Sequence, residues 1–188
     1  LRGISADDFL ALIAPQLVPT TEPETVALFS FSDTAVRAAI HEAKYHGSEK
    51  AFGLLSAALA EYLHEADDIE HRKSRISIVP VPLGKERHRE RGFNQIEEIV
   101  KLVSKEFPVT IDATLLERTR ETASQVSLPR REREENMRGA FRATRRADAS
   151  HTYIVIDDVI TTGATLQAAI DALKKASATH IVPLALAH

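Results

Sequence analysis

The sequence predicts an α/β fold with a mostly parallel sheet flanked by helices. Three segments, residues 76–83, 151–157 and 180–187, are almost wholly apolar. Such strands are typical of a parallel sheet that is buried on both faces. From residue 76 onward, strand candidates alternate with helical stretches, which is the order expected of parallel α/β units. Ligands bind such sheets at the carboxyl ends of the strands, so the residues that follow these strands are the first candidates for a site.

The remaining elements follow from periodicity and capping signals. Residues 1–24 contain Pro15, Pro19 and Pro23, so we treat them as an N-terminal segment that precedes a domain at 25–188. Residues 84–95 and 117–138 are polar and are predicted to be loops, the first of them basic. The other expected elements are a helix near 6–14, strands at 26–31, 109–116 and 139–143, and helices at 33–43, 49–65, 92–107 and 164–176.

Composition limits the class of protein. The 188 residues suffice for one domain, and 44% hydrophobic with 27% charged residues is a globular balance. The net charge of -3 provides no overall basic field for nucleic acid. No apolar run approaches the roughly 18 residues that span a bilayer, and no signal peptide is visible. We therefore expect a cytoplasmic protein without membrane insertion. The chain begins without Met, so we expect a trimmed N-terminus.

The chain has no cysteine. This excludes disulfides and thiolate metal sites, and it fits a reducing compartment.

The most informative stretch is "VIDDVITTGATL", residues 155–166. Asp157 and Asp158 end a buried strand, and a Thr-rich turn then leads into a helix N-terminus, where free N–H groups and the helix dipole attract anions. Gly163 permits a close approach or a positive φ. The two acids would repel a phosphate, but they suit ribose hydroxyls and a hydrated Mg²⁺. The alternative, an N-cap with acids that favour the dipole, explains only one Asp and one Thr. The Walker A lysine pattern is absent.

This stretch resembles the phosphoribosyl pyrophosphate (PRPP) signature of type I phosphoribosyltransferases. The resemblance implies the type I phosphoribosyltransferase fold with a small N-terminal hood. It also implies that Asp157 and Asp158 engage the ribose hydroxyls and Mg²⁺, with water between the metal and the carboxylates. The residues implied to surround the 5′-phosphate are Thr161, Thr162, Gly163, Ala164 and Thr165.

A second stretch, "IVPVPLGKERHRERGFNQ" at residues 78–95, is similar to the ComF (competence protein F-like) family. With three further stretches the resemblance covers roughly residue 26 to the end. It implies a pyrophosphate loop, in which guanidinium groups suit phosphate oxygens and a cis peptide is expected. A solvated basic loop is the alternative. The residues assigned to this loop are Val81, Pro82, Leu83, Gly84, Lys85, Arg87 and Arg91.

The resemblance also implies a flexible lid between residues 116 and 141, with Arg118, Gln125 and Arg138 among its positions. A charged surface loop is the alternative. Lys44 and Tyr45 are expected to face the site from the hood, whereas His46 is expected to be ordinary. Many family members carry an N-terminal cysteine-rich zinc module. Because this chain lacks cysteine, no zinc site is expected in it.

Two functions remain open from the sequence. The first is transfer of 5-phosphoribosyl from Mg·PRPP to an unidentified nitrogen nucleophile; a glutamine-dependent reaction is disfavoured because the chain has no cysteine nucleophile. The second is a non-catalytic role in DNA uptake or competence, with single-stranded DNA or a competence-machinery protein as partner. Aromatic residues are only 5% of the chain, which argues against a stacking surface for bases. The acceptor and a homodimer are left open.

Overall fold

The computed structural model describes residue 1 and residues 3–66, 75–120 and 130–188. Its elements are α1 (Ala6–Leu10), β1 (Gln16–Val18), β2 (Thr25–Phe29), α2 (Thr34–His46), α3 (Glu49–Glu65), β3 (Ile76–Pro80), α5 (Lys85–Arg91), α6 (Gln95–Glu106), β4 (Thr110–Ile111), β5 (Leu116–Arg118), α7 (Arg130–Met137), β6 (Phe141–Ala143), β7 (Thr152–Val159), α8 (Ala164–Lys175) and β8 (His180–Ala187).

The central feature is a six-stranded sheet in the order β1-β2-β8-β7-β3-β4. All neighbouring pairs are parallel except β1 and β2, which are antiparallel at one edge. β5 and β6 form a separate antiparallel pair. The predicted α/β class with a mostly parallel sheet is confirmed.

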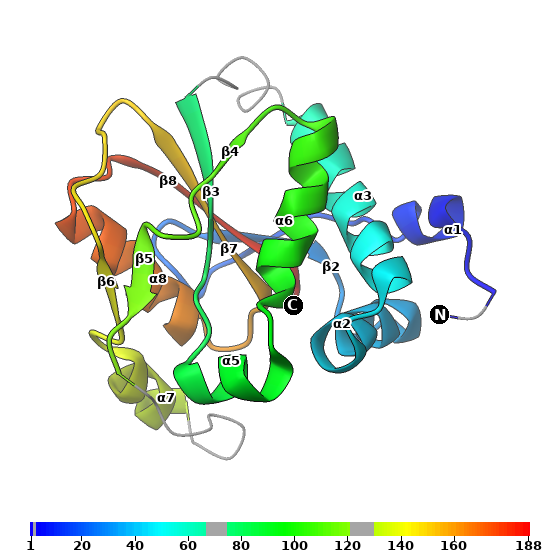
Figure 1. The fold of residues 1–188 in the computed structure, drawn as a ribbon, viewed down its shortest axis with the longest axis horizontal. Coiled ribbons are helices and arrows are strands. Elements are labelled where there is room, and N and C mark those ends of the chain that lie inside the picture. The colour runs from blue at the N-terminus through cyan, green and yellow to red at the C-terminus, as the bar shows by residue number, and fades with distance from the viewer. Residues whose placement is uncertain (2, 67–74, 121–129) are drawn as a thin grey trace.

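Helices cover both faces of this sheet (Figure 1). Helices α2, α3 and α6 lie on one face, and α8 with the β5–β6 pair lies on the other. Strand β7 shows how the two cores are separated. Ile154 and Ile156 pack into the first core, whereas Tyr153 and Val155 pack into the second. Alternate side chains of a strand point to opposite faces, so one apolar strand serves both cores.

The helices that follow β3 and β7 leave the sheet on opposite faces. β3 leads through α5 to α6 on the first face, while β7 leads to α8 on the second. Because β3 and β7 are neighbours in the sheet, their carboxyl ends border a crevice of the kind in which α/β proteins bind ligands.

Several local predictions are wrong. Residues 130–137 form helix α7 within the predicted loop at 117–138. Residues 85–91 form helix α5 instead of a basic loop, because Lys, Glu and Arg favour helix and Gly92 ends it in the left-handed conformation. Helix α2 continues through Tyr45 to His46 and ends at Gly47, which has φ 57°. Strand β3 ends at Pro80, three residues before the predicted end at residue 83.

Another concerns the cis peptide expected after β3. The one cis peptide in the described ranges is Glu22–Pro23. Val81 instead donates its N–H to Ile156 O at 2.9 Å, which continues the extended ladder beyond β3.

The N-terminal segment is part of the same sheet and core. Strand β1, which the sequence reading missed, pairs with β2. Phe9 of α1 is fully buried, and its ring lies 5.2 Å from that of Phe29. Within the described ranges, no helix combines the length and apolarity needed to cross a membrane.

Candidate functional site

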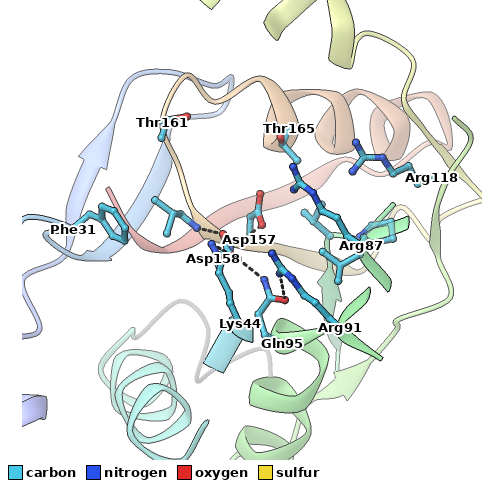
Figure 2. A pocket seen from close by; sticks show the side chains of 14 residues that line it. Phe31, Lys44, Arg87, Arg91, Gln95, Arg118, Asp157, Asp158, Thr161 and Thr165 are labelled. Carbon is cyan, nitrogen blue, oxygen red and sulfur yellow. Dashed lines mark hydrogen bonds and ion pairs between the residues drawn. The ribbon is translucent and has the colours of Figure 1, made fainter. Parts of the chain in front are cut away.

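A pocket of about 440 Å³ lies at the carboxyl ends of β3 and β7 (Figure 2). Its lining comes from α2, the segment after β3, helices α5 and α6, β5, β7 and the turn into α8. Of the residues predicted from the sequence, those that line it are Lys44, Val81, Pro82, Leu83, Arg87, Arg91, Arg118, Asp157, Asp158, Thr161 and Thr165.

The two adjacent acids lie on opposite faces of β7. Asp158 continues the alternation of Ile154 and Ile156, so it points toward α2 and α6. Asp157 continues the alternation of Tyr153 and Val155 toward the α8 side, where it also lines a small cavity formed by residues 159–166. The pair therefore presents two carboxylates in different surroundings.

Asp158 is held by three donors. Its Oδ2 accepts from Lys44 Nζ at 2.8 Å and from the side-chain amide of Gln95. Its Oδ1 accepts the N–H of Val159 at 2.6 Å. Gln95 in turn accepts a hydrogen bond from Arg91 Nη1 at 3.0 Å. These contacts tie the end of β7 to three helices, and they leave Asp158 fixed in orientation.

The carboxylate of Asp157 accepts fewer hydrogen bonds than that of Asp158. Its Oδ1 accepts the N–H of Asp158 at 2.8 Å, while Oδ2 has no partner among the described residues. Burial, together with the neighbouring Asp158 carboxylate, raises the pKa of Asp157 to about 7, and Lys44 and Arg87 oppose this only in part. The group is thus half-ionised near neutral pH and prepared to gain from a cation or a hydrogen-bond donor.

The turn into α8 has the features of an anion site. The N–H groups of Thr161, Thr162, Gly163 and Thr165 find no acceptor among the described residues. Gly163 is the N-cap of α8, with φ 78°. Helix dipole and unpaired amides both favour a negative ligand at this point.

The same turn is packed against the N-terminal segment. A Cβ on Gly163 would lie 2.6 Å from Thr20 O, so only glycine fits there. Glu22 donates its N–H to Gln167 of α8 at 2.7 Å and accepts at its carbonyl oxygen from Lys174 at 2.8 Å. The N-terminal segment therefore fixes the position of the turn.

Opposite the acids, the pocket is lined by cations. Arg87 and Arg91 reach it from α5, and Arg118 reaches it from β5 (Figure 2). The guanidinium carbon of Arg91 also lies 5.2 Å from the centroid of the Tyr45 ring, an arrangement that favours a cation–π interaction. Tyr45 itself is 61% exposed and does not line the pocket.

Several other residues named from the sequence do not line this pocket. Thr162, Gly163 and Ala164 line the small cavity at residues 159–166 instead. Gly84 and Lys85 begin α5 and do not line the pocket. Arg138 lines a separate cavity of about 210 Å³ beside Thr162 and Ala164. Gln125 lies outside the described residues.

Sequence reasoning missed three lining residues, Phe31, Gln95 and Val159. Gln95 carried a usable signal. It follows the helix N-cap Asn94, whose side chain accepts from Ile96 N and donates to Val81 O, so Gln95 starts a helix directly behind the segment after β3. Phe31 and Val159 are apolar and carried no such signal.

The residues fit a hard divalent cation. Mg²⁺ prefers oxygen ligands and is commonly bound through one or two carboxylates together with substrate phosphates. Asp157 offers the pocket an oxygen that has no partner among the described residues, and Asp158 lies beside it. Both are the residues to which the sequence assigned Mg²⁺.

The mostly parallel sheet flanked by helices is compatible with a type I phosphoribosyltransferase-like fold. No protein-family model matches the chain. It is 37% identical over 128 residues to the DNA utilization protein YhgH of Escherichia coli, which covers 68% of this chain and 56% of that protein. It is 34% identical over 116 residues to YhgH of Salmonella typhimurium (60% of this chain, 51% of that protein).

A third relative is Competence protein F of Haemophilus influenzae, which is 31% identical over 101 residues, covering 53% of this chain and 44% of that protein. The chain spans about half the length of the curated relatives it matches. These similarities support the ComF-like resemblance.

Proposed function

We propose that this protein binds Mg·PRPP and transfers its 5-phosphoribosyl group to a nitrogen nucleophile with release of pyrophosphate. The observation that carries the proposal is that one pocket brings together three parts: an Asp157 carboxylate oxygen without a partner among the described residues, Thr161 and Thr165 of the turn into α8, and two arginines of α5. In the described part of the chain, the amides of that turn also find no acceptor. These three parts match the diol, the 5′-phosphate and the pyrophosphate of PRPP.

Each part of the ligand has a place in this proposal. The turn at residues 161–165 holds the 5′-phosphate through its amides and hydroxyls. Asp157 accepts from a ribose hydroxyl. Arg87 and Arg91, with the segment at residues 81–83, face the pyrophosphate. Asp158 acts chiefly by holding this arrangement, because Lys44 and Gln95 already use its Oδ2.

The reaction breaks the bond between the anomeric carbon and the pyrophosphate oxygen, and that oxygen keeps the electron pair. The lone pair of the nitrogen nucleophile forms the new bond, and the nitrogen then releases its proton to water. Bound Mg²⁺ would supply charge neutralisation to the pyrophosphate. The chain's own contribution is positioning of the sugar and stabilisation of negative charge on the leaving group by Arg87 and Arg91. No covalent intermediate with the protein is needed.

Calorimetry with Mg²⁺ and PRPP tests binding. We expect saturable binding by the wild type, and at least a tenfold loss of affinity in the Asp157→Asn/Asp158→Asn double variant. The exposed Asp7→Asn variant, on α1, is the matched control and should bind like the wild type. An absence of binding, or equal binding by the double variant, would overturn the proposal.

A screen of nitrogenous acceptors for PRPP-dependent release of pyrophosphate then tests transfer. Pyrophosphate release that requires both an acceptor and Asp157 supports the proposed transferase activity. PRPP binding without release for every acceptor class would count against transfer.

We propose as a second candidate a role in handling single-stranded DNA. Two observations favour it: three relatives are named for DNA utilization or competence, and α5 carries Lys85, Arg87, Arg89 and Arg91. Fluorescence anisotropy with a labelled oligonucleotide over a range of salt concentrations measures it. The Arg87→Ala/Arg91→Ala variant should show a shallower salt dependence, whereas Lys105→Ala at the far end of α6 should not. Absence of salt-dependent binding would exclude this candidate.

A further inference from the structure

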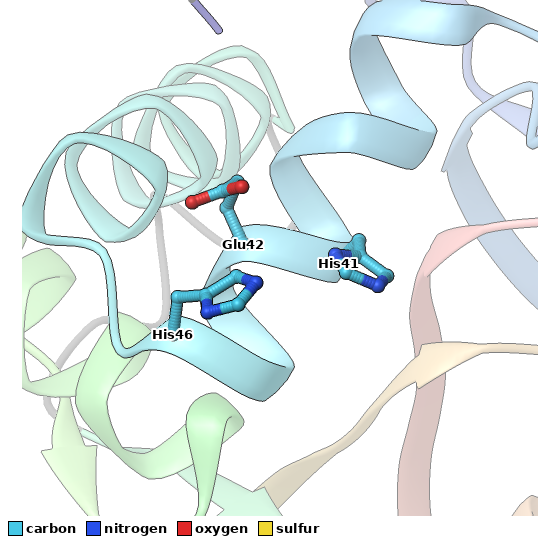
Figure 3. A group of neighbouring side chains, drawn as sticks. All are labelled: His41, Glu42 and His46. Carbon is cyan, nitrogen blue, oxygen red and sulfur yellow. The ribbon is translucent and has the colours of Figure 1, made fainter.

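The C-terminal half of α2 carries a group of side chains with metal-ligand chemistry that the pocket does not use. His41, Glu42 and His46 each offer a ligand atom, and these atoms all lie within 4.8 Å of one another (Figure 3). In the part of the chain that the structure describes, it is the one group of this kind. The sequence reading treated His46 as ordinary and did not consider the other two.

The ligand atoms of this group form no hydrogen bond or ion pair with the described residues. Neither imidazole has a hydrogen bond to a described residue; the His41 ring only lies 4.8 Å from that of Tyr45 and 5.6 Å from that of His46. Glu42 is half-buried as a residue, and its carboxylate has no ion pair or side-chain hydrogen bond among the described residues. The nearest cation in sequence, Lys44, is engaged by Asp158. A bound cation would give this carboxylate a partner of opposite charge.

The helix end adds to the attraction for a cation. Helix α2 ends at His46, so the group lies where the helix dipole places partial negative charge. The carbonyl oxygen of Glu42 accepts the N–H groups of Gly47 and Ser48, which anchors the backbone that carries the group. The backbone is thus fixed, while the three side chains retain rotational freedom.

The ligand set indicates the type of metal. Two imidazole nitrogens and one carboxylate oxygen suit Zn²⁺, whereas Mg²⁺ takes oxygen ligands. With bonds of about 2.0–2.1 Å and tetrahedral geometry, the ligand atoms would lie roughly 3.3 Å apart. Rotations of exposed or half-buried side chains that move each atom by about 1 Å would close the group to this size.

We propose that His41, Glu42 and His46 form a binding site for a divalent transition metal, with Zn²⁺ as the fitting ion and water as the fourth ligand. This site goes beyond the proposed transferase function and does not depend on it. It also differs from the sequence-based expectation of no zinc, which rested on the lack of cysteine. Because Lys44 lies within the same helical turn, a metal here would also hold the helix that contacts Asp158.

Titration calorimetry of the tag-free 188-residue protein with Zn²⁺ tests the site, with Co²⁺ absorption as a second readout of nitrogen ligation. We expect one tight equivalent in the wild type and a loss of affinity of at least tenfold in His46→Ala and in Glu42→Gln. His180→Ala, an exposed histidine at the start of β8, is the matched control and should bind like the wild type. Circular dichroism verifies that each variant is folded.

Three results would overturn the proposal. One is the absence of Zn²⁺ binding by the folded wild type. Another is unchanged affinity in both Glu42→Gln and His46→Ala. The last is loss of the tight equivalent in Asp157→Asn with retention in His46→Ala, since the ion would then occupy the acid pair. None of these results depends on PRPP, so this test and that of the transferase function fail independently.

Discussion

At the scale of single residues, the ionised form of Asp157 destabilises the folded protein. Its side chain is half-buried beside the Asp158 carboxylate, and its pKa is raised to about 7. A carboxyl with a raised pKa in the folded state favours folding in its protonated form. That contribution is present below the unfolded pKa of about 3.9 and is lost as the pH rises through about 7.

Replacing Asp157 with Asn should therefore stabilise the ligand-free protein more at higher pH. We expect the melting temperature of Asp157→Asn to exceed that of the wild type near pH 8 by a few °C, since 1 kcal/mol corresponds to roughly 2–4 °C for a chain of this size. Near pH 4 the difference should shrink toward zero. Thermal unfolding at both pH values measures it, with Asp171→Asn as control. A difference that does not change with pH would contradict the assigned pKa.

Gln95 is the residue through which Arg91 reaches Asp158. Gln95→Leu keeps the volume but removes both hydrogen bonds, so Asp158 loses one of the two side-chain donors on Oδ2. Because hydrogen bonds to charged groups contribute roughly 1.5–3 kcal/mol, we expect about tenfold or greater loss of Mg·PRPP affinity by calorimetry. The exposed Gln16→Leu variant on β1 should be unchanged. Equal loss in both variants would indicate a general effect on the fold.

At the scale of elements, the turn from β7 into α8 depends on packing from outside itself. Gly163 has a left-handed φ, and its α-carbon faces the backbone of Thr20. The segment between β1 and β2 thus determines which residue can start α8. Glycine is needed here for two reasons, backbone conformation and lack of space.

Gly163→Ala should therefore destabilise the protein by about 1–3 kcal/mol from backbone strain, and more if Thr20 has to move. Gly53→Ala is a matched control in the middle of α3, where a Cβ would meet nothing within 4 Å. There the exchange should stabilise by about 0.5–1 kcal/mol, because alanine favours helix. Chemical denaturation measures both. A change in the free energy of unfolding that has the same sign in both variants would contradict the described packing.

At the scale of the whole molecule, the N-terminal segment shares one core with the rest of the chain. Phe9 is fully buried in the core formed with α2, α3 and α6. Strand β1 adds the antiparallel edge of the sheet. Unfolding of this segment is therefore expected to accompany unfolding of the domain.

Phe9→Ala tests that expectation. Truncation of a buried Phe typically costs about 3–5 kcal/mol, so we expect a large fall in the midpoint of a single unfolding transition. Leu17→Ala, at a side chain that is 64% exposed, should have little effect. A separate early transition in Phe9→Ala, with the main transition unchanged, would show that the segment unfolds on its own.

Much of the fold followed from local pattern. Helix α3 has the predicted bounds Glu49–Glu65, and β8 has the predicted bounds His180–Ala187. In both elements, the periodicity and the end signals depend only on residues that are near one another in the chain, so they can be recognised from sequence. Helix α5 and strand β1 were missed because they are short and lack an apolar face or an alternating pattern.

The site was predictable in its chemistry and less so in its geometry. The sequence by itself determined that two acids end a buried strand and that a Thr-Gly turn opens the next helix, because both depend on neighbours in the chain. Only the tertiary structure decided that Asp157 and Asp158 face opposite sides of the sheet and that Gln95 meets Asp158 across 63 positions. In the tertiary structure, Lys44 also lines the pocket, whereas Tyr45 does not. The physical reason is that these contacts depend on the pairing of β3 with β7 and on the face to which each following helix turns, and neither is set by local sequence pattern.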